Sequence, residues 1–368
     1  MLHIYHQKST GIVGKEYIQD TPRKQLHSNR FQQLAIGDTF TLGITKQGKL
    51  FGWGQDFLGK GVEQKEPFPI PFETEAVVAS CGSKHMAVID KQGTAFTWGE
   101  NGSFFSGGGQ LGHGSIGAHV GAPTAVDAFG SLRAKIIAVS CGHAHTVFLT
   151  DEGEVWACGV GEYGVLGTGN SANSTVPVVL ECLENEQITR IACGYDHSLV
   201  LNVEGRIFSW GRNNAGQLGH SDSFIDIYSM EEFPRLVEDL PEVVEIAAGH
   251  GRSAAISEDG ELYVWGSRLN HAPKHISREL FNGLKVAKVA IGGSHDHSVI
   301  AVLTEDGGLW TFGDGSSHML GSGQRSGFLG KQPLPAMVES LKSRSVLQLF
   351  TGLGQHMAVL VEHNNERK

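Results

Sequence analysis

The sequence predicts an all-β fold, a seven-bladed β-propeller, from an internal repeat, a lack of helical periodicity and a high glycine content. One repeat covers residues 191–219: an apolar run ending in Cys-Gly, then His-Ser, a Gly turn, Trp-Gly and Gly-Gln-Leu-Gly. These phrases return about every 45 to 60 residues. Self-similarity at such a period indicates an array of supersecondary units. The 50 glycines suit short strands joined by tight turns.

Each repeat is expected to be a small antiparallel sheet. Residues 198–202 and 206–210 are short apolar or β-branched runs on either side of Gly205, which is a hairpin signal. The position that His197 occupies in its repeat, called the His slot below, recurs seven times along the chain. It holds Phe40, His85, His145, His197, Arg252, His297 and His356. The Trp-Gly slot follows in six of these units, at Trp53, Trp98, Cys158, Trp210, Trp265 and Phe312.

The seventh unit is incomplete at its C-terminal end. It begins near residue 346 and the chain ends at Lys368 before any Trp-Gly phrase. Residues 2–6, LHIYH, are similar to 262–266, LYVWG, and residues 11–14 are similar to 164–167. An open array would need polar caps at both ends. We therefore expect a propeller closed by strands from both termini, in which residues 1–30 complete the blade begun at about 346–361.

One domain, residues 1–368, should contain every blade, with two insertions at 102–133 and 222–235. The best helical candidate is 277–285, SRELFNGLK, which predicts one or two turns after an N-cap serine. Four of the five cysteines, at 81, 141, 158 and 193, occupy repeat positions, which predicts buried thiols that pack as small hydrophobes; Cys182 lies outside the pattern.

Charge and hydropathy exclude several classes of function. The formal net charge of −10 argues against direct nucleic-acid binding, which needs clustered Lys and Arg. No apolar run approaches the length of a membrane span, and no signal peptide is recognisable. We expect a soluble intracellular monomer, in the cytoplasm or the nucleus.

The residues do not predict chemistry of the protein's own. The repeat histidines recur once per unit and are interpreted as structural, each with a ring nitrogen bonded to backbone, because a metal set needs convergent ligands at short spacing. Residues 159–164, GVGEYG, satisfy a dinucleotide fingerprint but continue a β-repeat instead of opening a helix. We therefore expect no cofactor, no metal and no catalytic constellation; a hydrolase remains a remote alternative.

The segments between Gly and the His slot are the candidate binding surface. Each blade should present this loop on the same face, beside the central channel. The partner-binding candidates there are His143, Tyr195, Asp196, His250, His295 and Asp296. The alternative is a ring of solvated turns without a partner.

The two insertions are the other candidates. Phe104 and Phe105 lie in the first, and Phe224, Ile225, Ile227, Tyr228 and Met230 lie in the second. Long loops tend to be functional or disordered, and exposed aromatic residues favour partner contact. The alternative is that these side chains fold back over a blade edge.

The order of the phrases resembles the repeat of the regulator of chromosome condensation family. CGHAHTVFLTDEG (141–153), CGYDHSLVLNVEG (193–205) and WGRNNAGQLG (210–219) carry the resemblance over essentially the whole chain. It implies a seven-bladed propeller whose faces hold another protein. A protein-interaction platform is therefore the leading expectation.

The founding branch of that family implies a second function, guanine-nucleotide exchange on a Ran-like small GTPase. By this resemblance Asp196 matches an acidic exchange residue, His295 or His297 a histidine, and the loop 103–109 with Phe104 and Phe105 a wedge. The chain departs from that pattern one blade earlier, where His143 stands in place of an acid.

Overall fold

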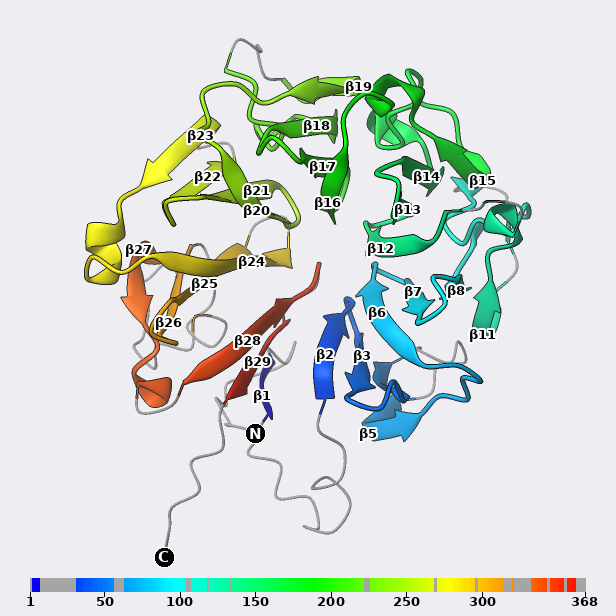
Figure 1. Cartoon of the computed structure of the whole chain (residues 1–368), viewed down its shortest axis with the longest axis horizontal. Coiled ribbons are helices and arrows are strands. Elements are labelled where there is room, and N and C mark those ends of the chain that lie inside the picture. Colours follow the sequence, from blue (N-terminus) through cyan, green and yellow to red (C-terminus); the bar gives the residue numbers. More distant parts are fainter. Residues whose placement is uncertain are drawn as a thin grey trace, which may run out of the picture.

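The structure is a computed structural model that describes residues 2–6, 31–55, 63–103, 107–117, 119–130, 132, 134–221, 226–267, 270–294, 297–313, 320, 332–342, 345–353 and 356–361. Six four-stranded antiparallel sheets follow one another around a central axis, and the first strand of each lies nearest that axis (Figure 1). We call these sheets blades 1 to 6.

The strands of each blade are consecutive in sequence, except for a small hairpin inserted in blade 2. Blades 1 to 3 consist of β2 (Phe31–Ile36), β3 (Phe40–Thr45), β4 (Leu50–Gln55) and β5 (Glu63–Pro69); β6 (Ala76–Cys81), β7 (His85–Asp90), β8 (Ala95–Gly99) and β11 (Val120–Ala125); and β12 (Ile136–Cys141), β13 (His145–Thr150), β14 (Val155–Gly159) and β15 (Ser174–Val179). The hairpin is β9 (Gly102–Ser103) with β10 (Gly107–Gly108).

The second half of the ring repeats the arrangement. Blades 4 to 6 consist of β16 (Ile188–Cys193), β17 (His197–Asn202), β18 (Ile207–Arg212) and β19 (Met230–Leu236); β20 (Val243–Ala248), β21 (Arg252–Ser257), β22 (Leu262–Gly266) and β23 (Asn270–Ile276); and β24 (Val286–Ser294), β25 (His297–Thr304), β26 (Leu309–Gly313) and β27 (Gln332–Met337). Short 3-10 turns are η1 (Asp127–Phe129), η2 (Glu162–Gly164), η3 (Glu181–Leu183), η4 (Arg278–Phe281) and η5 (Glu339–Leu341).

The remaining sheet corrects the prediction of seven blades. It holds β28 (Val346–Thr351), β29 (His356–Val361) and β1 (Leu2–His6), in the order β1-β29-β28. The N-terminal segment adds one strand to this sheet, antiparallel to β29, whereas a complete blade would need two. A fourth strand is absent among the described residues. The prediction of seven blades closed by both termini is therefore wrong: the structure has six blades and a three-stranded sheet.

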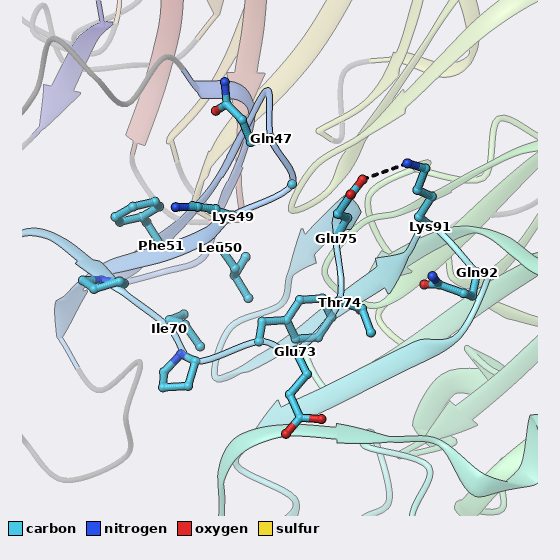
Figure 2. Close-up of a pocket in the computed structure, with 14 residues that line it drawn as sticks. Gln47, Lys49, Leu50, Phe51, Ile70, Glu73, Thr74, Glu75, Lys91 and Gln92 are labelled. Carbon is cyan, nitrogen blue, oxygen red and sulfur yellow. Dashed lines mark hydrogen bonds and ion pairs between the residues drawn. The ribbon is translucent and has the colours of Figure 1, made fainter.

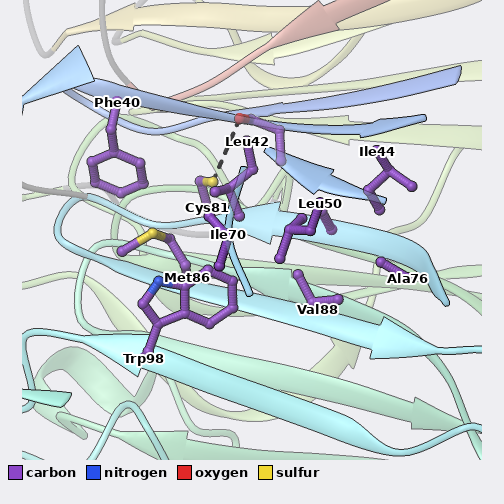
Figure 3. Close-up of a cluster of buried hydrophobic side chains, with 12 residues drawn as sticks. Phe40, Leu42, Ile44, Leu50, Ile70, Ala76, Cys81, Met86, Val88 and Trp98 are labelled. Carbon is purple, nitrogen blue, oxygen red and sulfur yellow. Dashed lines mark hydrogen bonds between the residues drawn. The ribbon is translucent and has the colours of Figure 1, made fainter. Parts of the chain in front are cut away.

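The apolar strand faces pack between neighbouring blades. Figure 3 shows one such core, where Leu42 and Leu50 of blade 1 lie against Met86, Val88 and Trp98 of blade 2. These side chains are at most 2% exposed. The buried cysteines belong to such cores as free thiols, as predicted.

Residues of the repeated phrases contact one another where two consecutive blades meet. At the junction of blades 4 and 5, His197 Nε2 lies 2.9 Å from the Oγ of Ser253, the residue that follows the His slot in the next blade. Ser253 Oγ donates to the Gln217 carbonyl in Gly-Gln-Leu-Gly at 2.8 Å, and Trp265 Nε1 donates to the same carbonyl at 2.9 Å. Three phrases of the sequence motif therefore form a single contact.

Two earlier junctions repeat this geometry. His145 Nε2 lies 3.1 Å from Ser198 Oγ, and Trp210 Nε1 donates to the Val165 carbonyl at 2.8 Å. His85 Nε2 lies 2.9 Å from Thr146 Oγ1. The histidines are structural, and the partner of Nε2 is a hydroxyl of the next blade, which the sequence did not predict. Since the hydroxyl donates to a carbonyl, the imidazole must carry its proton on Nε2.

The glycine of the Leu-Gly phrase also belongs to the junction. A Cβ on Gly167 would lie 2.9 Å from Trp210 Nε1, and one on Gly219 would lie 2.8 Å from Trp265 Nε1. Both glycines have positive φ, at +73° and +80°. Only glycine allows the next blade's indole to approach this closely.

The predicted helical segment forms a single 3-10 turn. η4 begins directly after Ser277, whose hydroxyl accepts a hydrogen bond from Glu279 N at 3.3 Å. Phe281 at its end is fully buried and meets Trp310 edge-on, with ring centroids 5.6 Å apart. Among the described residues, no helix is long and apolar enough to cross a bilayer.

Candidate partner-binding face

The loops between the first and second strands of neighbouring blades lie against one another. His143 N donates to the Tyr195 carbonyl at 3.0 Å, and Tyr195 N donates to the Gly249 carbonyl at 3.1 Å. A Cβ on Gly194 would lie 2.4 Å from that same carbonyl, which explains the Gly before this loop. Alternate connections of an antiparallel sheet emerge at the same end, so these loops form one face. We call it the loop face.

Three aromatic rings from consecutive blades form a column on this face. His143 and Tyr195 stack with centroids 4.0 Å apart at an interplanar angle of 14°, and Tyr195 and His250 stack at 4.0 Å and 23°. All three residues are half-buried, which leaves part of each accessible at the surface. The sequence placed these residues on one face but did not predict their stacking.

A polar chain continues from the column to blade 1. Tyr195 Oη lies 3.2 Å from His143 Nε2, and His143 Nδ1 lies 2.9 Å from Ser83 Oγ. Ser83 in turn bonds to the Asp38 carboxylate. Four consecutive blades thus contribute one hydrogen-bonded series, in which Asp38 and Ser83 join the predicted candidates His143 and Tyr195.

Burial keeps most of this series uncharged. Desolvation lowers the pKa of His143 although the nearby Asp38 carboxylate opposes it. Desolvation also raises the pKa of Asp38, against its bond to Ser83, and with the charges of Asp196 and Asp38 it raises the pKa of Tyr195 to about 12. At neutral pH His143 and Tyr195 therefore offer hydrogen-bonding edges and neutral rings.

Asp196 is held by a neighbouring cation. Its Oδ2 lies 3.2 Å from Arg212 Nη1, and the Asp196 side chain is 20% exposed. The Arg212 guanidinium also covers the Tyr163 ring, 4.3 Å from its centroid. The Asp196 carboxylate is thus paired with a cation of the propeller itself. The sequence did not predict this pair, because the two residues lie 16 positions apart.

The second insertion presents apolar side chains to solvent. Ile227 is 62% and Tyr228 77% exposed. Asp226 shapes the turn, because its Oδ1 accepts from Tyr228 N at 2.8 Å and its own N–H donates to Ser229 Oγ at 2.8 Å. This insertion connects the third and fourth strands of blade 4, so it emerges at the loop face. These two side chains do not fold back over the blade edge.

The other predicted site residues stay predictions. Phe104, Phe105, His295 and Asp296 lie outside the described residues, as does the side chain of His297, whose backbone belongs to β25. The hairpin β9–β10 that flanks Phe104 and Phe105 connects the third and fourth strands of blade 2. It therefore emerges at the loop face as well.

Comparison with known proteins identifies the family. The model of the RCC1-like domain matches residues 6–295 and 107–366. The human E3 ubiquitin-protein ligase HERC2 is 30% identical over 97% of this chain, which corresponds to 7% of the ligase. The fold is similar to human WBSCR16 (TM-score 0.77, 24% identity, 91% of this chain and 87% of that one). It is also similar to Prp20p of Saccharomyces cerevisiae, from a study of its binding to Gsp1p and histones (TM-score 0.82, 18% identity, 99% and 92%).

Residues of the repeat phrases form the junctions between blades, and the family model matches nearly the whole chain. The chain belongs to the RCC1-like domain family.

Proposed function

We propose that this propeller is a protein-interaction platform that binds a partner protein through the loop face. The observation that carries the proposal is the column of His143, Tyr195 and His250, in which stacked aromatic rings reach the surface from three blades. Aromatic residues with one polar edge are enriched at protein interfaces. The exposed Tyr228 and Ile227 extend the same face with apolar area.

Removing the last ring of the column tests the proposal. His250→Ala is expected to weaken partner capture by about tenfold or more, because central aromatic contacts dominate interface energies. Loss of one stacked pair should cost only about 1 kcal/mol of stability, so the fold is kept. Immobilised wild type and variant are exposed to the same cell lysate, and retained proteins are quantified by mass spectrometry.

The matched control is His275→Ala. His275 forms the propeller's other described Tyr–His ring pair, with Tyr263, at centroids 5.3 Å apart on the outer strands β22 and β23. This variant should retain the same proteins as the wild type. Equal retention by His250→Ala and the wild type would contradict binding through the column.

Exchange on a Ran-like small GTPase is the alternative outcome. Prp20p has been studied for its binding to Gsp1p, but 18% identity extends only the fold to this chain. The Asp196–Arg212 pair counts against a carboxylate that acts on a GTPase. Acceleration of fluorescent GDP release from Ran at catalytic protein concentration, lost in Asp196→Ala, would establish exchange instead.

A further inference from the structure

Every sheet around the axis has the same irregularity at the start of its innermost strand. The pairing of this strand with the next one shifts between its first and third residues, so its second residue is a β-bulge. A bulge leaves one residue outside the ladder and re-aims its side chain. The bulge residues are Gln32, Val77, Ile137, Thr189, Val244, Ala287 and Leu347. We call them the bulge ring.

The bulge ring surrounds the central axis at the end away from the loop face. The innermost strands lie nearest the axis (Figure 1), and each begins at the end opposite the loop that follows it. Neighbouring inner strands contact one another directly. Ser140 Oγ accepts a hydrogen bond from Cys193 N at 2.9 Å, and Arg190 Nε donates to the Val244 carbonyl at 2.9 Å. Equivalent bulge residues of adjacent blades therefore lie side by side.

Most of the bulge ring is apolar and open to solvent. Its large apolar members are between 39% and 57% exposed, and they are Val77, Ile137, Val244 and Leu347. Val203 adds to this surface: it is 64% exposed, and its N–H donates to the Gln187 carbonyl, two residues before Thr189. Exposed apolar patches with a polar rim mark interaction sites.

The segments that border the bulge ring in blades 3 to 5 are strongly acidic. They are the turns 151–154, 203–206 and 258–261 and the connections 180–187 and 237–242, which all lie at this end of the blades. Arg206 is their only cation, and it is paired with Glu186 and Glu204. Exposed carboxylates without an ion-pair partner in the described part of the chain are Glu152, Glu181, Glu184, Glu238, Asp239, Glu242, Glu258 and Asp259.

The acids lie next to the apolar members of the bulge ring. Glu242 comes two residues before Val244, and its carbonyl accepts a hydrogen bond from Glu258 N at 2.9 Å. Blade 2 differs, because Glu75 before its inner strand pairs with Lys91 at 3.0 Å, at the edge of a pocket between blades 1 and 2 (Figure 2). The excess of negative charge is therefore local to blades 3 to 5.

We propose that the bulge ring docks an amphipathic segment of a partner protein whose apolar side chains are flanked by lysine and arginine. The apolar side chains pack on Ile137 and Val244, and the cations lie over the acids of blades 3 to 5. An apolar centre inside a polar rim is the usual anatomy of a protein interface. The same acids repel nucleic acids and anionic membranes. This surface faces away from the loop face and does not depend on the function proposed for it.

A model amphipathic peptide is the probe. A fluorescent helical peptide built from leucine and lysine alone is titrated with the full chain, with anisotropy as the readout. We expect saturable binding that weakens as salt is added, because the ion pairs are exposed. The same peptide with glutamate in place of lysine should not bind. Absence of saturable binding by the leucine–lysine peptide would overturn the proposal.

The apolar contact is tested by a double substitution, Ile137→Ser with Val244→Ser. It should weaken peptide binding about tenfold or more, because two apolar contacts are lost. The matched control is Val176→Ser with Val178→Ser, two exposed valines on the outer strand β15 of blade 3. The control should bind within about twofold of wild type, and equal loss in the two variants would overturn the proposal.

The charge contact is tested by Glu242→Lys with Glu258→Lys. We expect about fivefold weaker binding or more, because two attractions become repulsions. Glu63→Lys with Glu66→Lys, on the outer strand β5 of blade 1, changes the net charge equally and should bind within about twofold of wild type. Equal loss in both variants would mean that only the total charge matters, which contradicts a local site.

A second copy of this chain is the other occupant to test. Sedimentation of the wild type should give a monomer, and a dimer that Ile137→Ser with Val244→Ser dissociates would overturn the proposal of a different partner. His250→Ala should keep the wild-type affinity for the peptide. Failure of the loop face is therefore distinguishable from failure of the bulge ring.

Discussion

Replacing Trp210 with alanine is expected to lower the unfolding free energy by about 3–5 kcal/mol, the usual cost of truncating a large buried aromatic residue. Trp210 is fully buried, and its Nε1 donates to the Val165 carbonyl of the preceding blade. The substitution therefore opens a cavity at a junction between blades and removes a buried hydrogen bond. Urea denaturation followed by circular dichroism measures the loss.

Two further variants locate the cause. Trp210→Phe keeps most of the packing and loses the indole donor, so about 1–2 kcal/mol should be lost. Trp156 lies two residues before Cys158, which occupies the Trp slot of blade 3, and is partly exposed, so Trp156→Ala should cost clearly less than Trp210→Ala. Equal costs for the two alanine variants would contradict the role assigned to the junction.

Stability should fall steeply in mild acid, by about 4 kcal/mol per pH unit from the three junction histidines together. Burial lowers the pKa of His85, His145 and His197 from 6.5 to about 3. Between these values the unfolded chain binds protons that the folded chain does not. The contribution is therefore fully present above pH 6.5 and is lost progressively as the pH falls toward 3. Urea titrations at pH 7, 6 and 5 measure the slope.

Single substitutions separate these histidines from the carboxylates. His197→Gln keeps an N–H that can donate to Ser253 and removes one titrating group, so the slope should fall by about one third. An unaltered slope in a folded His197→Gln protein would contradict the linkage.

Much of the fold could be predicted because the residues of the repeat phrases form the contacts between blades. His197, Trp210 and Gly219 recur because each occupies a junction that every blade must form. Strand number at the termini was not predictable in this way. The seventh His slot shows that a hairpin begins, but how many strands join β29 depends on pairing with a distant segment, and β1 adds only one.

The sequence predicted which residues of the candidate site lie together, but it did not predict how their side chains interact. Equivalent loops had to emerge at one end, which placed His143, Tyr195 and His250 together. Their stacking depends on the distance between blades, and the Asp196–Arg212 pair depends on side-chain geometry across strands β17 and β18.

The junction between blades also bears on how such a chain can grow. His197 and Ser198 are adjacent in sequence, yet His197 reaches forward to Ser253 while Ser198 receives His145 from behind. Each repeat therefore encodes both complementary halves of the interface. Duplication of one gene segment would deliver a unit that already fits its parent on either side, so new units need no newly evolved contact.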